Sequence, residues 1–386
     1  MASELFSEVD KLRTQMLTNV ELMADQRVHV VHNDSEVLAL IEDIILKIVT
    51  SLSKDEAPVL SLPNRSSWVN VRYLLQHCSS LSTLYFTTFT HTCDSPASIT
   101  KFAQIVKILS VIYKLIQSNT YATKRDIYYN DTQLFGSQAK VDHIVDDISC
   151  LLKVPRRSLH VLATSKGLIT GDLCYLEEDG TRIDCRSSTA FPVSSNIGGI
   201  KNIVSSAKFV LIVEKDATFQ RLLDDDLCAK LAPCIMITGK GVPDVNSRLM
   251  VRKLWDALHV PIFAMVDADP YGIEIMCIYK YGSLAMSFEA RSLTVPSVMW
   301  LGLLPSDLQR LRVPENALIP LTKKDETKLN SLLKRPYLQN QPDWQKEIEL
   351  MQQSKSKAEI QALTAIAPDF LSSIYLPNKL RYGGWV

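Results

Sequence analysis

The sequence lacks the cysteine spacings that would indicate a zinc site or a disulfide framework. Its eight cysteines are scattered along the chain, and no two of them form a C-x-x-C pair. No apolar run approaches the roughly 18 residues needed to span a bilayer, and the amino terminus has no basic flank followed by an apolar segment. We therefore expect a protein of a reducing compartment that is neither secreted nor inserted in a membrane.

The sequence also lacks a Walker A loop. The segment TGKG at residues 238–241 follows an apolar run and contains two glycines and a lysine, but the spacing G-x-x-x-x-G-K-[ST] is absent. The chain has no repeat of fixed period and no low-complexity tract. We expect that this chain has no ATP site.

The chain has no net charge, with 42 basic and 42 acidic side chains, but these charges are unevenly distributed. Residues 1–60 contain 11 acidic and 5 basic side chains, which leaves 31 acidic and 37 basic side chains in residues 61–386. Residues 153–166 contain no acid and four basic side chains, Lys153, Arg156, Arg157 and Lys166. This segment is either an ordinary solvated basic face or a surface that contacts phosphate.

The first half of the chain shows helical periodicity followed by a hairpin signal. Apolar residues recur at helical spacing over residues 37–52, 100–118 and 139–152, and Asp34 or Ser35 is placed to cap the first helix. Apolar and polar residues then alternate around Asp179-Gly180, a dipeptide typical of a two-residue hairpin turn. Helices followed by a hairpin are the layout of a winged helix, which places one helix on DNA.

The second half of the chain shows a different pattern. Residues 187–207 are rich in Ser, Gly and Asn and indicate a connection between two domains. Four apolar runs follow, FVLIV, CIMIT, IFAMV and VMWLG, and each leads into a helical pattern. Strands that alternate with helices indicate a parallel sheet with covered faces. Ser306 and Gln309 have the spacing of a capping box for the helix after the fourth run.

Three acidic residues follow two of these predicted strands. Glu214 comes directly after FVLIV, and Asp267 and Asp269 come directly after IFAMV. Ligands collect beyond the carboxyl ends of parallel strands, and alternate residues of an extended chain face the same side. A set of carboxylates without His or Cys suits Mg²⁺ or Mn²⁺. The alternative is that acids follow strands simply because loops are polar.

The segment KRDIYYNDTQLF, residues 124–135, contains two adjacent tyrosines, and the question is whether one of their phenols is a nucleophile. A tyrosine with a pKa of about 10 is a poor nucleophile unless a base or a cation helps it to ionise. Arg125 precedes Tyr129 by four residues, a spacing that places both side chains on one face of a helix. From the residues alone, a packed aromatic pair is the more ordinary interpretation of Tyr128 and Tyr129.

Several motifs together resemble one family. VEKDAT, with Glu214, and DADPYG, with Asp267 and Asp269, are similar to the metal-binding motifs of Toprim domains. The chain also looks like the family of the topoisomerase VI A-type protein, which includes eukaryotic meiotic members. This second resemblance covers residues 35–386 and is carried by five segments in order, KRDIYYNDTQLF, SLHVLATSKGLITGDL, MITGKGVPD, IPLTKKDETKLNSLLKRPYL and YLPNKLRYGGWV.

The resemblance implies a protein of two domains, one α+β and one α/β. A winged-helix (catabolite-activator-like) DNA-binding domain over residues 35–186 would carry the tyrosine, and a Toprim domain with a parallel sheet and a carboxy-terminal extension would occupy residues 187–386. Residues 1–34 would form an acidic helical extension. The beginning of this extension is either a helix that binds a partner or an ordinary solvated helix.

The resemblance also implies a type IIB topoisomerase-like transesterase, of the isomerase class, that makes meiotic DNA double-strand breaks and initiates homologous recombination. Tyr129 would attack a phosphodiester to leave a 5′-phosphotyrosyl link, and Arg125 would neutralise developing charge. Glu214 and Asp267, supported by Asp269, would hold Mg²⁺, with Mn²⁺ as the alternative. The candidates for contact with the DNA backbone are Lys124, Arg156, Arg157, Lys166, Lys215 and Lys240.

The implied partners are double-stranded DNA, a second copy of the chain, accessory meiotic recombination proteins and an ATP-binding partner of the topoisomerase VI B type. Each hybrid site would combine the tyrosine of one copy with the metal of another, on meiotic chromosomes in the nucleus. Two other interpretations remain open. One is a Toprim metal-dependent nuclease, which releases free DNA ends, and the other is a non-catalytic DNA-binding scaffold.

Overall fold

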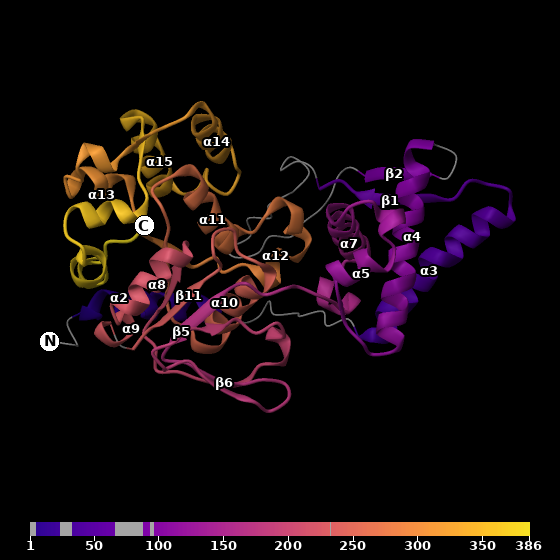
Figure 1. The fold of residues 1–386 in the computed structure, drawn as a ribbon, viewed down its shortest axis with the longest axis horizontal. Helices are drawn as coiled ribbons and strands as arrows, with labels where there is room; N and C mark the ends of the chain where they lie inside the picture. Colours follow the sequence, from indigo (N-terminus) through magenta and orange to yellow (C-terminus); the bar gives the residue numbers. More distant parts are fainter. Residues whose placement is uncertain (1–4, 24–32, 66–87, 93–95, 232) are drawn as a thin grey trace. The chain divides into compact units, whose positions relative to one another are not determined.

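The computed structural model describes residues 5–23, 33–65, 88–92, 96–231 and 233–386 (Figure 1). These residues fall into two compact units. We call the first the helical unit; it contains the described residues from Asn33 to Thr164 and the segment Ser283–Arg291. We call the second the sheet unit; it contains the amino-terminal helix α2 (Ser7–Met23) and the described residues of Ser165–Gly282 and Ser292–Val386.

The helical unit is built on three amphipathic helices, as the periodicity predicted. They are α3 (Asp34–Ser53), α4 (Pro96–Gln117) and α7 (Gln138–Leu152). The predicted cap of α3 is wrong: Asn33, not Asp34 or Ser35, lies immediately before the first helical residue, and its Oδ1 accepts a hydrogen bond from the Glu36 N–H at 2.8 Å. The faces that these helices bury form one apolar core.

Short strands complete the helical unit. Strand β1 (Val59–Pro63) pairs antiparallel with β2 (Thr88–Thr92). Strand β3 (Ala122–Thr123) pairs in parallel with β4 (Val161–Leu162). This second pairing brings α5 (Lys124–Asn130), which directly follows β3, close to the 3₁₀ turn η3 (Arg156–Leu159), which precedes β4. A winged helix remains a proposal for this unit.

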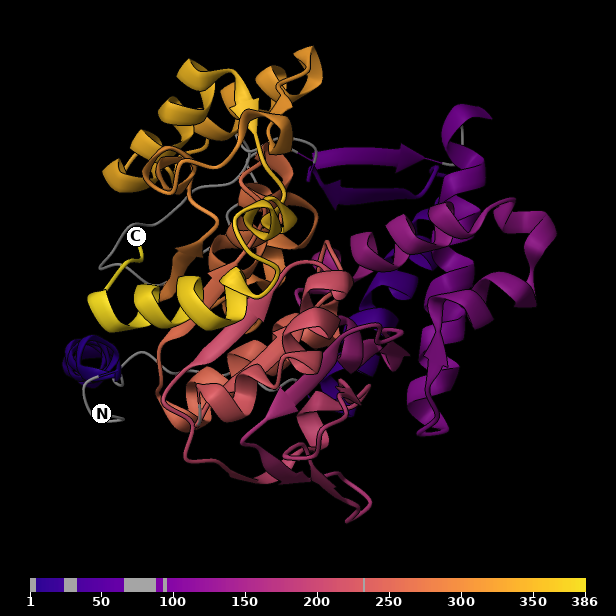
Figure 2. The ribbon, with the colours of Figure 1, turned by 60° about the vertical axis from the view of Figure 1, so that its left-hand side comes forward.

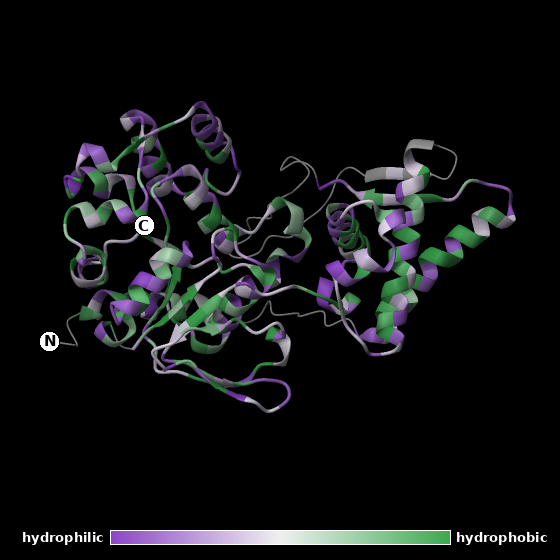
Figure 3. Cartoon of the chain, viewed as in Figure 1, coloured by the Kyte–Doolittle hydropathy of each residue, from purple (hydrophilic) through white to green (hydrophobic). Residues whose placement is uncertain are grey.

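The sheet unit contains the predicted parallel strands. Four neighbouring strands of a six-stranded sheet run in parallel, in the order β13 (Val298–Gly302), β12 (Ile262–Met265), β10 (Val210–Val213) and β11 (Ile235–Thr238). They are strongly hydrophobic (Figure 3), and their side chains are mostly buried. The chain between them forms α8 (Asp216–Asp224), α10 (Val245–Leu258) and α11 (Pro270–Tyr281).

The predicted hairpin forms, but in the sheet unit. Strands β6 (Cys174–Leu176) and β7 (Arg182–Asp184) pair around Asp179-Gly180, and β6 also pairs with β9 (Lys201–Val204). Strand β5 (Leu168–Gly171) pairs antiparallel with β11 and with β8 (Phe191–Pro192). Residues 187–207 therefore lie within the sheet unit, and the two compact units divide at Thr164 and Ser165. The division of the chain into domains at residues 1–34, 35–186 and 187–386 stays a prediction.

The remaining elements are mostly short helices and turns. Helix α2 lies beside α16 (Leu376–Tyr382) in the sheet unit (Figure 2). The others are α6 (Thr132–Phe135), α9 (Leu227–Lys230), η4 (Ile197–Gly199), η5 (Leu284–Glu289), α12 (Ala290–Leu293), α13 (Pro305–Arg310), η6 (Glu315–Ala317), β14 (Ile319–Pro320), α14 (Lys323–Leu333), α15 (Pro342–Ser354), β15 (Ser356–Lys357), η7 (Ile360–Ala365), the π-helical turn η8 (Leu371–Tyr375) and α16 (Leu376–Tyr382). Within the described residues, no helix is long and apolar enough to cross a membrane.

The start of α13 differs from its prediction. Ser306 and Gln309 do not form a capping box, because the helix already begins at Pro305. The carboxylate of Asp307 accepts a hydrogen bond from the Leu304 N–H at 3.2 Å instead. The N–H of Ser306 donates to Glu347 of α15 at 2.8 Å, so this helix start is held by a neighbouring helix.

Candidate active site

The two tyrosines of the segment 124–135 lie on the short helix α5. This helix begins after Thr123, whose hydroxyl accepts from the Asp126 N–H at 3.2 Å while the Asp126 carboxylate accepts from the Thr123 N–H at 2.8 Å. Tyr128 is half-buried against the helical core, whereas Tyr129 is 67% exposed. Their ring centroids lie 5.4 Å apart. The pair is thus divided, with one ring packed and one phenol open to solvent.

The basic residues around α5 have different surroundings. Arg125 is exposed on α5, four residues before Tyr129, and no hydrogen bond joins the two side chains in the described part of the chain. Lys124 is held to α7, because its Nζ donates to Asp146 Oδ1 at 2.8 Å and to the Asp142 carbonyl at 3.0 Å. Burial lowers the pKa of Lys124, although Asp146 opposes the shift. Because an ammonium has three N–H donors, a phosphate contact by Lys124 would use the donor that these two bonds leave, or would open the ion pair.

Two further arginines lie beside the start of α5. Arg156 and Arg157 belong to η3 and are half-buried. The parallel pairing of β3 with β4 places η3 near the start of α5, and the positive charge of Arg156 contributes to the lowered pKa of Lys124. The guanidinium of Arg157 lies 5.9 Å from the ring centroid of Tyr121, and this ring stacks on His160 at 4.3 Å. The helical unit therefore gathers Lys124, Arg125 and Arg156 near one helix end.

Glu214 and Asp267 meet at the carboxyl ends of the neighbouring parallel strands β10 and β12. Glu214 is 7% exposed and Asp267 is 2% exposed. The backbone N–H of Asp267 donates to Glu214 Oε2 at 2.8 Å. Burial, and then the negative charge of Asp267, raise the pKa of Glu214 to about 7. The strand ends thus bring two of the three predicted acids into one buried site.

Asp269 lies close to this pair but has a local structural role. It is the N-cap of α11, and its Oδ1 accepts from the Gly272 N–H at 2.6 Å. Burial raises the pKa of Asp269, and the charge of Asp267 adds to the shift. A Cβ at Gly272 would lie 2.6 Å from the Asp267 carbonyl oxygen and 2.9 Å from Glu214 Oε2. The absence of a side chain at Gly272 therefore lets the helix start approach both acids.

The lysines near the carboxylates are engaged in polar contacts. Lys215 Nζ lies 2.7 Å from Asp267 Oδ2, and Lys240 Nζ lies 3.1 Å from Asp216 Oδ2. Lys166 is exposed, and its Nζ donates to the Lys240 carbonyl at 3.1 Å. The structure thus places Lys166, Lys215 and Lys240 along the same edge of the sheet as the acids.

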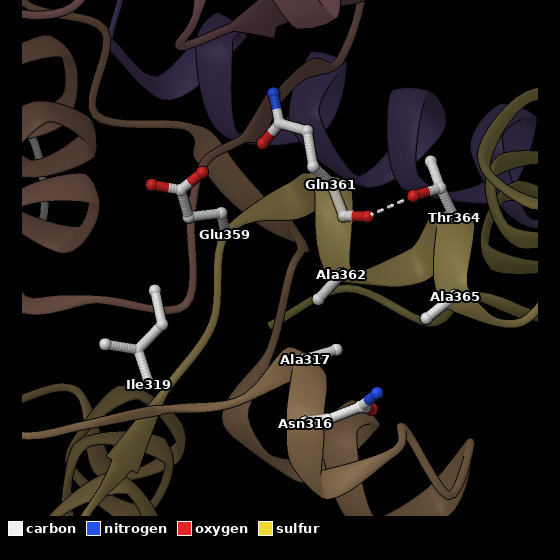
Figure 4. Close-up of a pocket in the computed structure, with 8 residues that line it drawn as sticks. All are labelled: Asn316, Ala317, Ile319, Glu359, Gln361, Ala362, Thr364 and Ala365. Carbon is white, nitrogen blue, oxygen red and sulfur yellow. Dashed lines mark hydrogen bonds between the residues drawn. The ribbon is translucent and has the colours of Figure 1, made fainter.

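A segment near the carboxy terminus completes the carboxylate site, and no local pattern in the sequence indicated it. The Ala358 N–H donates to the Ala268 carbonyl at 3.1 Å, and the Ile360 N–H donates to Asp267 Oδ1 at 2.9 Å. Between these two anchors, Glu359 Oε2 lies 3.2 Å from Lys215 Nζ. Glu359 also lines an open pocket together with Asn316, Ala317 and residues of η7 (Figure 4).

The donor set suits a divalent cation, although no group of three or more His, Cys, Asp or Glu is arranged to hold one among the residues that the structure describes. Glu214 and Asp267 provide only oxygen ligands, as Mg²⁺ and Mn²⁺ prefer. The negative charge of Asp267 contributes to the raised pKa of Glu214, so a cation between them would relieve the repulsion. Asp267 already holds one cation, the ammonium of Lys215.

Comparison with known proteins agrees with this arrangement. Residues 209–380 match the family model for the Toprim domain of Spo11 and of the A-type protein of topoisomerase 6, and residues 100–161 match the model "Type IIB DNA topoisomerase". The first match contains all three acids, and the second contains Tyr129. The chain belongs to the topoisomerase 6A/Spo11 family. Mammalian and plant proteins are among its relatives.

Three relatives illustrate the extent of the similarity. The chain is 63% identical to the meiotic recombination protein SPO11 of Homo sapiens over 362 residues, which cover 92% of this chain and 89% of the relative. It is 58% identical to the SPO11 of Mus musculus, over 100% of this chain and 98% of the relative. It is 36% identical to the A-type protein of DNA topoisomerase 6 from Arabidopsis thaliana, over 90% and 80%. The chain is thus a type IIB topoisomerase-like, DNA-cleaving enzyme of this family.

Proposed function

We propose that Tyr129 is the nucleophile with which this chain makes meiotic DNA double-strand breaks by transesterification. The phenolic oxygen of Tyr129 forms a bond to a backbone phosphorus while the bond from phosphorus to the 3′ oxygen breaks. The phenol loses its proton and the 3′ oxygen gains one, which leaves a 5′-phosphotyrosyl protein and a free 3′-hydroxyl. Family membership and the similarity to meiotic recombination proteins support this function.

The observation that carries the proposal is the difference between the two tyrosines. A nucleophile must reach a phosphate on a bulky duplex, and Tyr129 is 67% exposed while Tyr128 packs against the helical core. Arg125, exposed on the same helix, has the charge to neutralise a phosphate oxygen as negative charge develops. The other cations proposed to hold the DNA backbone are Lys124, Arg156, Arg157, Lys166, Lys215 and Lys240.

The carboxylates have a separate role in the proposal. Glu214 and Asp267, with Asp269 nearby, would hold Mg²⁺, with Mn²⁺ as the alternative. When bound, the ion would supply positive charge that orients the phosphate and stabilises the leaving oxygen. Asp269 keeps the start of α11 against the pair through its bond to the Gly272 N–H.

The proposal also includes partners. Tyr129 belongs to the helical unit and the carboxylates belong to the sheet unit. The active site proposed here combines Tyr129 of one copy with the acids of a second copy, so that two sites cut two strands. The family implies DNA binding and a B-type partner, and we propose that this partner binds ATP, that accessory meiotic recombination proteins join the complex, and that it acts on meiotic chromosomes in the nucleus.

Covalent trapping tests this function. The complete chain, assembled with its partners and Mg²⁺, is incubated with duplex DNA labelled at the 5′ or 3′ ends, denatured, and probed for DNA linked to protein. We expect linkage to 5′ ends with the unchanged chain and with Tyr128→Phe, and none with Tyr129→Phe. Free DNA ends that persist in Tyr129→Phe would identify a Toprim nuclease. An assembled complex that binds DNA and metal without cutting would identify a scaffold.

A further inference from the structure

Lys215 and Glu359 form a pair of charges at the edge of the carboxylate site. We propose that Lys215 is the resident counter-cation of Glu214 and Asp267, and that Glu359 receives its ammonium when a divalent cation displaces it from Asp267. Glu359 would then be a positioning residue that makes the site accessible to metal. This inference rests on the metal-binding role proposed above for Glu214 and Asp267.

The Lys215 ammonium is paired with one of the two carboxylate oxygens of Asp267. Its Nζ lies 2.7 Å from Asp267 Oδ2, while the other oxygen of Asp267, Oδ1, accepts from the Ile360 N–H at 2.9 Å. Oδ2 is therefore the oxygen of Asp267 that is paired with a side-chain cation rather than with the backbone. Any metal that binds through Oδ2 has to compete with the lysine.

Glu359 lies on the same ammonium. Its Oε2 lies only 3.2 Å from Lys215 Nζ, so the ammonium already touches both acids and can be retained by Glu359 alone with little movement. The backbone on both sides of Glu359 is fixed, through the Ala358–Ala268 and Ile360–Asp267 hydrogen bonds. Because this backbone is already ordered, Glu359 can receive the displaced ammonium without a further loss of backbone conformational entropy.

The different burial of the two acids gives the exchange a direction. The Asp267 side chain is 3% exposed, whereas the Glu359 side chain is 53% exposed and borders an open pocket (Figure 4). A buried carboxylate has a strong need for a counter-charge, and an exposed carboxylate is already solvated. With no metal, the lysine is best placed on Asp267; once a divalent cation supplies more charge there, the lysine is best placed on Glu359.

Metal affinity in a double-mutant cycle tests this inference. Binding of Mn²⁺ to the complete chain is measured by titration calorimetry, without DNA, for the unchanged protein, Lys215→Met, Glu359→Gln and the double variant. We expect Lys215→Met to bind Mn²⁺ more tightly, on the order of tenfold, because the competing cation is gone. We expect Glu359→Gln to bind Mn²⁺ more weakly, by roughly threefold to tenfold, because the displaced lysine has no acceptor.

The double variant separates this role from that of a direct ligand. Without Lys215, Glu359 has no ammonium to receive, so we expect the double variant to match Lys215→Met within about twofold, since an exposed charge is largely screened. Lys240→Met is the matched control, because Lys240 pairs with Asp216 at the same sheet edge. We expect its affinity to change by less than about twofold.

Three results would overturn the inference. The first is a Mn²⁺ affinity of Lys215→Met that is unchanged or weaker. The second is a loss of Mn²⁺ affinity from Glu359→Gln that is equal with and without Lys215. The third is a change of Mn²⁺ affinity in Lys240→Met as large as that in Lys215→Met. Lys215→Gln provides a second version of the lysine variant, and thermal unfolding without metal confirms that each variant is folded. Unchanged protein that binds no Mn²⁺ would instead reject the proposed metal site. DNA linkage through Tyr129 is a separate measurement, so the two failures can be told apart.

Discussion

The backbone N–H of Asp267 donates a hydrogen bond to Glu214 Oε2 at 2.8 Å, which ties together the ends of two parallel strands that are 53 residues apart in the chain. The two acids are buried, and burial together with the Asp267 charge raises the pKa of Glu214 to about 7. Two carboxylates in such proximity cost stability unless a cation or a proton compensates them. The site is therefore one in which added metal should stabilise the fold.

The first prediction concerns metal-dependent stability. Mg²⁺ should raise the free energy of unfolding by about 1.4 kcal/mol at about ten times its Kd, because it binds the folded chain only. Glu214→Gln should remove most of this gain, since it removes one of the two buried charges. The measurement is thermal unfolding at several Mg²⁺ concentrations. Glu349→Gln, at an exposed position of α15, is the control and should keep the full gain; an equal loss in both variants would contradict the prediction.

The second prediction concerns Gly272. Replacing a glycine inside a helix by alanine ordinarily stabilises a protein by roughly 0.5–1 kcal/mol. Here the new Cβ would lie 2.6 Å from the Asp267 carbonyl oxygen and 2.9 Å from Glu214 Oε2. We therefore expect Gly272→Ala to lower the free energy of unfolding by about 1–3 kcal/mol and to weaken Mn²⁺ binding.

Urea unfolding and Mn²⁺ titration measure these effects. The control is Tyr271→Ala, because Tyr271 is the neighbouring residue on α11 and its side chain is exposed. We expect it to change stability by less than about 1 kcal/mol. A Gly272→Ala variant that is more stable than the unchanged protein would show that the backbone does not need this close approach.

The third prediction concerns the ion pair that holds α5 to α7. The side chains of Lys124 and Asp146 are 14% and 19% exposed, and their charged atoms lie 2.8 Å apart. Asp146→Asn should lower the free energy of unfolding by roughly 2–4 kcal/mol, because it leaves a buried ammonium without its counter-charge. Lys124→Met should cost less, since its methylenes remain and no buried cation is left.

Denaturant unfolding of the two variants checks this order. Asp142→Asn is the comparison, because Lys124 bonds to the carbonyl of Asp142, and the Asp142 carboxylate attracts the ammonium less strongly than that of Asp146 does. Equal losses for Asp146→Asn and Lys124→Met would mean that the pair contributes through packing alone. A larger loss in Asp142→Asn would point to a different electrostatic partner.

The fourth prediction is a pH dependence at the start of α14. Burial alone would raise the pKa of Asp325, but hydrogen bonds from Thr322 and the ion pair with Lys357 at 3.0 Å outweigh it and lower the pKa. A carboxylate with a lowered folded-state pKa contributes stability that is fully present above its unfolded pKa of about 3.9 and is lost as pH falls through the folded value.

Asp325→Asn should therefore lower the free energy of unfolding by about 1–2 kcal/mol at pH 7, and the difference from the unchanged protein should shrink below about pH 4. Urea unfolding at pH 7 and below about pH 4 measures this difference in the free energy of unfolding. Glu326→Gln is the neighbouring control, because its partner Lys355 is exposed, and we expect a change below about 1 kcal/mol. A difference that stays constant with pH would exclude the charge of Asp325 as its source.

Much of the fold follows from patterns local in the sequence. The apolar runs FVLIV, CIMIT, IFAMV and VMWLG became parallel strands, and the helical periodicities became α3, α4 and α7. Helix ends were less predictable: Asn33 caps α3 and Asp307 takes the place expected of Gln309. A cap depends on where the first turn begins, and one residue of difference changes which side chain faces the free N–H groups.

In the candidate site, too, some residues could be predicted from local sequence patterns and others could not. Glu214, Asp267 and Asp269 could be named from the sequence because strand ends in a parallel sheet lie at one edge, which is a general property of this architecture. Tyr129 could be named only by resemblance, since the sequence pattern does not distinguish it from Tyr128. The structure adds that the Tyr128 ring is packed and the Tyr129 ring is exposed.

By itself, the sequence determined the strands, the main helices and the acids at the strand ends, because hydrophobic periodicity and chain order act over a few neighbouring residues. Only the tertiary structure decided that the hairpin at residues 174–184 pairs within the sheet unit and that Glu359 meets Lys215, 144 positions earlier. Such pairings depend on which distant segments bury their surfaces against one another. No local pattern in KAEIQ specifies that its glutamate will lie beside a lysine at the end of another strand.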